Sequence, residues 1–456
     1  MTDLKEKQER DQWGSKLGFI FAAAGSAVGL GNLWKFPYLA GQNGGGVFVV
    51  IYLGLVLLIG FTLMMAELVL GRNTQLSPVG AYRKLKEKWA WVGAIGVLAS
   101  FLIVTYYSVI GGWIIKYIIS ALTGAFNTTD LATLEGVFTS FIGAPVEPLI
   151  YHAIFMLMTL GIVMGGISGG IEKASKILMP GLFIMMVVLM IRSITLPGAM
   201  EGVKYLLQPD FSKLNMSVVV SALGQVFFSL SLGMGVIVTY GSYLSKDENL
   251  VESSFIIPAL DTIIALLAGL TILPAVFALG FDPAGGPGLL FVTLPGVFAK
   301  MPLGQLFAVL FFVLVLFAAV TSSMSLLEAA VSLTVDEFNW DRKKATIGLG
   351  ILAFLIGVPS SLANGPVLGN VTFIAGTNFF DSMGIITDNL LLPLAALTLA
   401  IFVGWVWGTD KALAEATNQG KVKFTIGKCW AFAIKYVAPL AIGYILISGL
   451  IPLFKQ

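Results

Sequence analysis

Long apolar runs without charged residues recur along most of this 456-residue chain. Several exceed the roughly 18 residues that a helix needs to cross a lipid bilayer. Hydrophobic residues make up 57% of the chain and charged residues 11%, and the mean hydropathy is +0.91. Because hydrocarbon offers no water to the backbone, a membrane-spanning segment must pair its own N–H and C=O groups. The sequence therefore predicts an all-α polytopic membrane protein without a sizeable soluble domain.

The residue types that carry most enzyme chemistry are scarce in this chain. Cys429 and His152 are its only cysteine and its only histidine. One cysteine excludes an intramolecular disulfide framework and a cysteine-rich metal site. A membrane enzyme would need positioned titratable groups, and a channel would need a continuous polar pore. We therefore expect neither of these classes and no nucleic-acid partner, and the net charge of +2 indicates no particular partner.

Hydropathy predicts eleven membrane-spanning helices, which use most of the chain. Their expected ranges are 15–38, 45–71, 90–115, 148–167, 176–195, 216–243, 254–280, 302–335, 345–357, 385–408 and 429–454. An odd number of spans places the two termini on opposite sides. Lysine and arginine gather in the loops of one side, and basic loops stay in the cytoplasm. We expect a multi-pass protein of the cell membrane with a cytoplasmic N-terminus and an extracellular C-terminus. Lys35 and Lys435 lie within spans and are not counted with the loops.

Two of these segments are interrupted at their centres by small residues. The first contains AGSAVGLGN at 24–32, and the sixth contains FFSLSLGMG at 227–235. A helix that unwinds there frees backbone groups, which persist in hydrocarbon only where protein, ions or a solute satisfy them. Because the two breaks lie five helices apart, the sequence predicts a five-plus-five inverted repeat with a binding site between the unwound segments.

The repeat divides the chain into few parts. We expect a cytoplasmic tail at 1–13, one membrane core at 14–408 and an additional eleventh helix at 429–454. Within the core, the first repeat covers about 14–195 and the second about 216–408. The lipid bilayer is the only macromolecular partner that this plan implies, and the sequence does not indicate an oligomeric state.

Several motifs in the chain resemble those of a known family. They are WGSKLG at 13–18, GSAVGLGN at 25–32, FP at 36–37, NGGG at 43–46, YY at 106–107, QVFFSLS at 225–231 and TSS at 321–323. In this pattern the chain is similar to the neurotransmitter:sodium symporters, a family with the LeuT fold and discontinuous helices one and six. The eleven-helix plan most resembles the bacterial transporters of hydrophobic amino acids. The resemblance implies sodium-coupled symport of a small molecule by alternating access.

The resemblance assigns the substrate site to both breaks and two further helices. The carboxylate of an amino acid would meet the amides of Leu30 and Gly31 and the hydroxyl of Tyr107, since helix N-termini suit anions. Backbone carbonyls beside the breaks would receive its ammonium group. The whole implied set is Ala27, Leu30, Gly31, Ile103, Tyr107, Phe228, Ser229, Ser231, Met234, Ser322 and Leu326.

The resemblance also implies two sodium sites made of oxygen ligands, which suit a hard cation. The first site would consist of Ala27, Asn32, Ser229 and Asp261. The second would consist of the carbonyls of Gly25, Val28 and Ala318 and the hydroxyls of Thr321 and Ser322. A single hydroxyl in a membrane helix is more often bonded to the preceding turn, so only the joint pattern supports these sites.

Gly29 separates two kinds of substrate. Monoamine transporters of the family carry an aspartate at this position, which supplies the charge that their substrates lack. The glycine therefore favours an amino acid, and the largely apolar pocket favours hydrophobic side chains, both aliphatic and aromatic. Met234 stands where LeuT has phenylalanine and would repack around different substrates, although it also reads as a core residue. The alternative is a sodium-coupled carrier of another small zwitterion or amine, such as betaine, GABA or a monoamine.

Asp261 places an acid inside a predicted span, which is costly without a partner and a function. LeuT has asparagine at this position. As a sodium ligand, Asp261 would supply the negative charge that chloride-dependent relatives obtain from a bound halide, so we expect no chloride requirement. The alternative is a structural pairing of Asp261 elsewhere. Glu67, a second intramembrane acid, is expected to accept hydrogen bonds near the broken helices.

Alternating access requires a gate on each side of the site. By resemblance, Arg10 and Asp336 form a cytoplasmic ion pair, and Trp13 is an aromatic plug beneath the site. On the outer side, Phe228 and Tyr107 would form a lid below Lys35. The family's acidic partner in span ten is replaced here by a glycine at 384, and Asp381, one turn away, is the candidate substitute.

Overall fold

The computed structural model describes residues 11–282 and 288–451. Within these ranges every named element is a helix and none is a strand, as the sequence predicts. Eight helices are long and apolar enough to cross a membrane, and two bent pairs raise the number to ten. A further broken span consists of α11 (Met216–Ser229) and α12 (Val236–Ser242), so the described part of the chain accommodates the eleven predicted spans.

The spans are built from the following elements. The eight continuous ones are α3–η2–α4 (Gly46–Thr74), η3–α6 (Glu87–Leu122), η4–α9 (Ile167–Ile194), α13 (Leu250–Ala278), α15 (Gly304–Phe338), α16 (Arg342–Leu362), α17–η8–α18–η9–α19 (Phe379–Ala416) and α20–η10–α21 (Gly427–Leu450). The bent pairs are α1 (Lys16–Ala27) with η1–α2 (Gly31–Gln42), at 50°, and α7 (Leu131–Gly143) with α8 (Glu147–Val163), at 74°.

Polar side chains mark where several helices begin. Ser15 accepts a hydrogen bond from the amide of Gly18 at the start of α1, at 3.1 Å. Asn215 before α11, Asn249 before α13 and Asp341 before α16 cap their helices in the same way. These side chains satisfy amides that have no partner within the helix, so the boundaries follow from local sequence.

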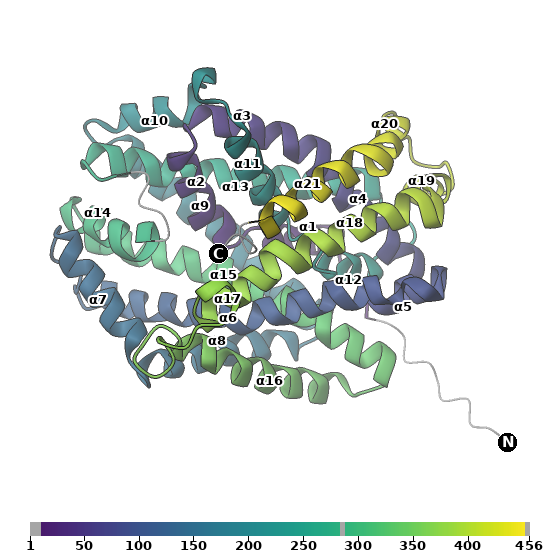
Figure 1. Ribbon diagram of the computed structural model, residues 1–456, viewed down its shortest axis with the longest axis horizontal. Coiled ribbons are helices and arrows are strands. Elements are labelled where there is room, and N and C mark those ends of the chain that lie inside the picture. The colour runs from purple at the N-terminus through teal and green to yellow at the C-terminus, as the bar shows by residue number, and fades with distance from the viewer. Residues whose placement is uncertain (1–10, 283–287, 452–456) are drawn as a thin grey trace.

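Three short helices lie outside the predicted ranges. They are α7, α10 (Ala199–Leu207) and α14 (Leu294–Lys300), and they gather at the left end of the molecule in Figure 1. A fourth, α5 (Pro78–Leu85), lies with α19 (Thr409–Ala416) at the opposite end. None is long enough to span a bilayer, and hydropathy alone therefore leaves them in loops.

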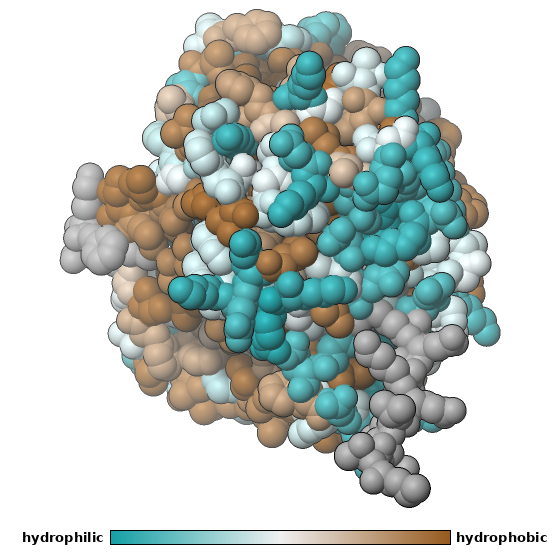
Figure 2. Space-filling view, turned by 90° about the vertical axis from the view of Figure 1, so that its right-hand side faces the viewer, coloured by the Kyte–Doolittle hydropathy of each residue, from teal (hydrophilic) through white to brown (hydrophobic). Residues whose placement is uncertain are grey.

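Hydrophilic and hydrophobic residues occupy different parts of the surface, as expected of a membrane protein. Figure 2 looks onto the end that holds α5 and α19, where hydrophilic residues gather in the middle of the face and hydrophobic residues follow much of its edge. In the interior, α6 (Ala90–Leu122) and α15 pack along one another. Glycines bring further helices close: a Cβ on Gly112 of α6 would lie 2.6 Å from the backbone nitrogen of His152 in α8.

Candidate functional site

The first span is broken at the predicted position. Helix α1 ends at Ala27, and η1 (Gly31–Lys35) begins only after three residues. Val28 has extended backbone angles, φ −73° and ψ 101°, which take the chain out of the helix. The small residues of this segment therefore mark a real interruption within the membrane core.

Side chains accept hydrogen bonds from two of the amides that the first break exposes. The N–H of Gly29 donates to Oδ1 of Asn32 at 3.1 Å. The N–H of Leu30 donates to the hydroxyl of Tyr107 over a longer distance, 3.4 Å. Leu30 and Tyr107 are thus neighbours, as the predicted carboxylate site requires.

The second break, at residues 230–235, contains residues with positive φ angles and contacts a buried acid. Ser231 has φ +53°, a left-handed conformation that residues with a Cβ rarely adopt, and Gly233 and Gly235 have φ +77° and +70°. The N–H of Gly233 donates to a carboxylate oxygen of Glu67 at 2.7 Å. This contact confirms the expectation that Glu67 accepts hydrogen bonds beside the broken helices.

The two breaks contact each other directly. The hydroxyl of Ser231 donates to the carbonyl of Ser26 at 3.0 Å, and the hydroxyl of Ser322 donates to the same carbonyl at 3.2 Å. Across the pair, Nε2 of Gln225 donates to the carbonyl of Gly31 at 2.8 Å. Residues about 200 positions apart in sequence therefore form one polar centre, with α15 as its third wall.

Asp261 of α13 is fully buried at the edge of this centre. Its carboxylate accepts hydrogen bonds from Nδ2 of Asn32 at 2.8 Å, from the hydroxyl of Ser229 at 2.9 Å and from the hydroxyl of Tyr52 at 3.3 Å. All three donors are neutral, and none of the ion pairs found in the described residues involves Asp261. A buried carboxylate is costly without a compensating cation, so this arrangement suits a positive ion. Tyr52 is a functional candidate that the sequence analysis missed.

The residues predicted for the second sodium site lie where α1 meets α15. A Cβ on Gly25 would lie 3.2 Å from Cβ of Thr321, so the two helices are in close contact there. The hydroxyl of Thr321 donates to the carbonyl of Ala318 at 3.0 Å, and that of Ser322 to the carbonyl of Val28 at 3.5 Å. The five predicted residues are therefore gathered at one contact, where the hydroxyls of Thr321 and Ser322 donate to carbonyls of α15 and of the first break.

The residues predicted to surround the substrate's side chain come from α6, the second break and α15. Ile103, Met234 and Leu326 are apolar and buried, and Tyr107 is 4% exposed. The hydroxyl of Ser100 donates to the carbonyl of Met234 and fixes the break against α6. The wall they form is largely apolar, so it favours an apolar group over a charged one.

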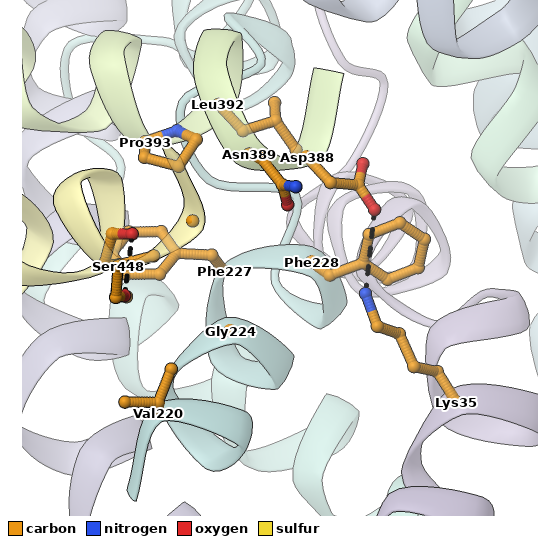
Figure 3. A pocket seen from close by; sticks show the side chains of 12 residues that line it. Lys35, Val220, Gly224, Phe227, Phe228, Asp388, Asn389, Leu392, Pro393 and Ser448 are labelled. Atoms are coloured by element: carbon orange, nitrogen blue, oxygen red, sulfur yellow. Dashed lines mark hydrogen bonds and ion pairs between the residues drawn. The ribbon is translucent and has the colours of Figure 1, made fainter. Parts of the chain in front are cut away.

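Phe228 and other residues of α11 line a cavity of about 210 Å³, together with residues of η8 and α21 (Figure 3). Lys35 lies at its edge, with Nζ 3.7 Å from Oδ2 of Asp388 and 4.2 Å from the centre of the Phe228 ring. The ring also packs on the first break, since a Cβ on Gly31 would lie 2.8 Å from Cδ1 of Phe228. Phe228 thus lies between this cavity and the first break.

The partner of Lys35 corrects the sequence prediction. Asp381 lies on α17 (Phe379–Gly384), is exposed, and forms no ion pair with Lys35 in the described residues. Asp388 takes that place from η8 (Ile385–Leu391), a π-helical segment. Asp381 precedes position 384 by three residues and Asp388 follows it by four, so both lie about one helical turn from it and spacing alone does not choose between the two acids.

Replacing Asp388 by asparagine is expected to weaken the packing at the Lys35 side of the polar centre. Both side chains of the ion pair are about 30% exposed, so the pair is worth at most about 1 kcal/mol, or about five-fold. We expect the KM for substrate to rise by up to that factor while the maximal rate changes less. Initial-rate uptake measures both, with Asp381→Asn as the matched control. Equal effects of the two substitutions would contradict the assignment.

Trp13 closes the opposite side of the polar centre. Its Nε1 donates to the carbonyl of Tyr240 at 3.0 Å, and its backbone N–H donates to the carbonyl of Tyr243 at 3.3 Å. The Trp13 and Tyr240 rings meet edge to face with centroids 5.1 Å apart. Asp336 accepts a hydrogen bond from the amide of Ser77 at 2.6 Å. Arg10 lies outside the described residues, so its pairing with Asp336 stays a prediction.

A second polar contact beside Trp13 was not anticipated. Glu328 of α15 is fully buried, pairs with Arg342 at the start of α16 and accepts from the hydroxyl of Tyr243 at 2.7 Å. Arg342 also donates to the carbonyl of Val163 at 3.3 Å. An acid within an apolar span signals such a partner. The position of Glu328 within the span from Gly304 to Phe338 was the available clue.

Comparison with known proteins identifies the family to which this chain is similar. The chain matches the family model of the sodium:neurotransmitter symporter family over residues 10–133 and 139–456. It is 43% identical to the uncharacterized sodium-dependent transporter YhdH of Bacillus subtilis, across 96% of this chain and 97% of that protein. An uncharacterized sodium-dependent transporter of Haemophilus influenzae is 38% identical, across 97% and 99%.

A solved structure shows the same fold. MhsT in complex with L-phenylalanine superposes with a TM-score of 0.88 and is 45% identical, covering 96% of this chain and 100% of its own. The two broken spans and the buried site between them are thus parts of a LeuT-type transporter. The chain belongs to the sodium:neurotransmitter symporter family and is a sodium-dependent membrane transporter.

Proposed function

We propose that the protein imports neutral hydrophobic L-amino acids, aliphatic and aromatic, together with sodium and without chloride. The observation that carries this proposal is the buried Asp261 carboxylate, which neutral donors from three other segments surround. A sodium ion between Asp261, Asn32 and Ser229 would supply the missing positive charge. Because the carboxylate is part of the protein, no halide is needed to balance the ion.

Recognition of both ends of an amino acid follows from the first break. The hydrogen bond between Leu30 and Tyr107 is long, and a substrate carboxylate placed beside it would accept from the Leu30 amide and the Tyr107 hydroxyl together. Gly29 leaves no room for an acidic side chain, since even a Cβ would lie 2.5 Å from Oγ of Ser322. The substrate therefore has to bring its own carboxylate, which favours an amino acid over a monoamine.

The apolar wall and the comparison with MhsT favour a hydrophobic cargo. Ile103, Met234 and Leu326 offer no polar group to a substrate side chain. The related MhsT structure holds L-phenylalanine. We infer that leucine-like and aromatic side chains both fit, because the Met234 side chain can change its conformation.

Two sodium ions and the direction of transport complete the proposal. The second ion would sit at the contact of α1 and α15, and the end with α5 and α19 would face the cytoplasm. Ion binding can favour one state only by its difference in binding free energy between the states. Each sodium that enters across 100 mV adds about 2.3 kcal/mol of driving force. Opening of the Lys35–Asp388 side and of the Trp13 side would alternate.

Uptake into proteoliposomes tests the proposal. A sodium gradient is expected to drive accumulation of L-leucine, L-phenylalanine and L-tryptophan, with unchanged rates when gluconate replaces chloride. Betaine, GABA and serotonin are not expected to compete. Competition by one of these at lower concentration than leucine would move the assignment to the alternative carrier class, and a chloride requirement would contradict the role of Asp261.

A further inference from the structure

Lys435 is a lysine inside the eleventh span that plays no part in the transport site. It lies in η10 (Ala433–Val437), the π-helical segment between α20 (Gly427–Phe432) and α21 (Ala438–Leu450). Lys35, a lysine in the first broken span, has an acidic partner. In the described ranges Lys435 contacts aromatic rings and forms no ion pair. An ionised side chain within a span calls for a compensating group.

The surroundings of Lys435 face outward, toward lipid. Only 22% of the most apolar window of this span is buried in the protein. Nζ lies 4.4 Å from the centre of the Trp405 ring and 5.6 Å from that of Tyr436. Trp405 is 56% exposed and Tyr436 is 42% exposed. The ammonium group is therefore at the outer surface of the bundle, beside two amphipathic aromatic side chains.

The local structure holds this group in place. Nε1 of Trp405 donates to the backbone carbonyl of Lys435 at 3.0 Å, which ties η9 (Phe402–Gly408) to η10. Gly404 permits the approach, because a Cβ there would lie 3.0 Å from Cα of Lys435. The Trp405 ring also packs edge to face on Tyr436, with centroids 5.5 Å apart. A fixed frame of this kind distinguishes the site from a freely moving surface lysine.

The depth of Lys435 matches the inner edge of a lipid headgroup layer. The span begins at Gly427, so Lys435 lies eight residues, or about 12 Å, along the helix from that end. The end in question lies near α19 in Figure 1. The long stem of lysine carries its ammonium group toward the interface, where tryptophan and tyrosine are also favoured. Lys428, exposed about two turns nearer the end, adds a second positive charge.

We propose that Lys435, Trp405 and Lys428 form a binding site for the headgroup of an anionic phospholipid in the leaflet on the side of α19 and α20. The phosphate pairs with the lysines, and the acyl chains lie along the exposed apolar residues of α21, among them Leu440 and Ile447. Under the orientation proposed above, this is the cytoplasmic leaflet, which carries anionic lipid. The inference does not depend on which amino acid is transported.

Native mass spectrometry of the purified full-length transporter, titrated with phosphatidylglycerol or phosphatidylcholine, tests this site. The wild type is expected to retain phosphatidylglycerol preferentially. Lys435→Gln should lower that affinity about five-fold, the factor that corresponds to one basic residue near an anionic headgroup. Lys435→Arg should restore it. Lys213→Gln, which removes an exposed lysine outside this site, is the charge-matched control.

A second measurement shows whether each variant is folded. A sodium-dependent increase in thermal stability, measured on every variant in detergent, shows that the transport site is folded whether or not lipid binds. Equal retention of the two lipids by the wild type, or equal loss in Lys435→Gln and Lys213→Gln, would overturn the proposal. A dimer that dissociates on Lys435→Gln would assign the surface to a second copy of the chain and would also overturn it.

Discussion

Replacing Asp261 by asparagine is expected to abolish sodium-driven uptake at physiological sodium. The substitution removes the only full negative charge found in the hydrogen-bonded group of Asn32, Ser229 and Tyr52. It also places an amide N–H₂ against three donors. Loss of one partner from a buried charge pair costs about 3–5 kcal/mol, so the apparent sodium affinity should fall by about 100-fold or more. Sodium-dependent thermal stability and uptake at increasing sodium measure this change.

The matched control for Asp261→Asn is Asp388→Asn, which removes an aspartate from the outer ion pair and leaves the sodium ligands intact. The control should keep its sodium affinity within a few-fold of the wild type. An Asp261→Asn protein that is folded and retains wild-type sodium affinity would show that the carboxylate is paired for structure only. That outcome is the structural alternative that the sequence left open.

Replacing Gly29 by aspartate is expected to eliminate amino acid uptake, and replacing it by alanine to reduce uptake by at least about ten-fold. An added Cβ would lie 2.5 Å from Oγ of Ser322 and 3.1 Å from the hydroxyl of Tyr107. Both neighbours hold the first break in place, through the Ser26 carbonyl and the Leu30 amide. The aspartate would in addition repel the carboxylate of the substrate.

Glycines elsewhere in the spans provide the control for Gly29. A Cβ on Gly54 of α3 (Gly46–Leu55) or on Gly161 of α8 would meet nothing within 4 Å. Gly54→Ala and Gly161→Ala should therefore transport at nearly the wild-type rate, since alanine is the better helix former. Uptake by Gly29→Ala equal to that of these controls would show that the break moves enough to accept a side chain, and the argument for an amino acid substrate would lose its steric basis.

The breaks themselves were predictable because small residues in a membrane span leave a strong local signal. The run of glycine, alanine and serine at 24–32 predicted an interruption, and α1 ends at Ala27 within that run. FFSLSLGMG at 227–235 predicted another, and the gap between α11 and α12 lies there. Asp261 and Glu67 were found for a related reason, as acids in apolar surroundings. Such features depend on residues close together in sequence.

Other parts of the site depend on geometry that spacing does not reveal. Asp388 partners Lys35, although Asp381 lies about as far along the helix from position 384 on the other side. Tyr52 reaches Asp261 across two helices, and no motif connects the two residues. The predicted fourth segment at 148–167 also omitted α7, because a 74° bend separates it from α8. Tertiary packing, rather than local propensity, decides these features.

Direct contact between the breaks suggests how binding and closure are linked. Ser231, in a strained left-handed conformation, donates to the carbonyl of Ser26, so movement of either break disturbs the other. Phe228, two residues before the second break, carries the contact with Lys35. An ion or amino acid bound between the breaks would therefore act on the Lys35–Asp388 pair through only a few residues.

In the proposed mechanism, two interrupted helices hold sodium and an amino acid between them. A structure determined with sodium and L-phenylalanine tests it most directly. We expect one ion in contact with the Asp261 carboxylate and Asn32, and the substrate carboxylate at the amides of Leu30 and Gly31. Density for the amino acid only in the cavity above Phe228, with the breaks closed on each other and no ion at Asp261, would contradict it.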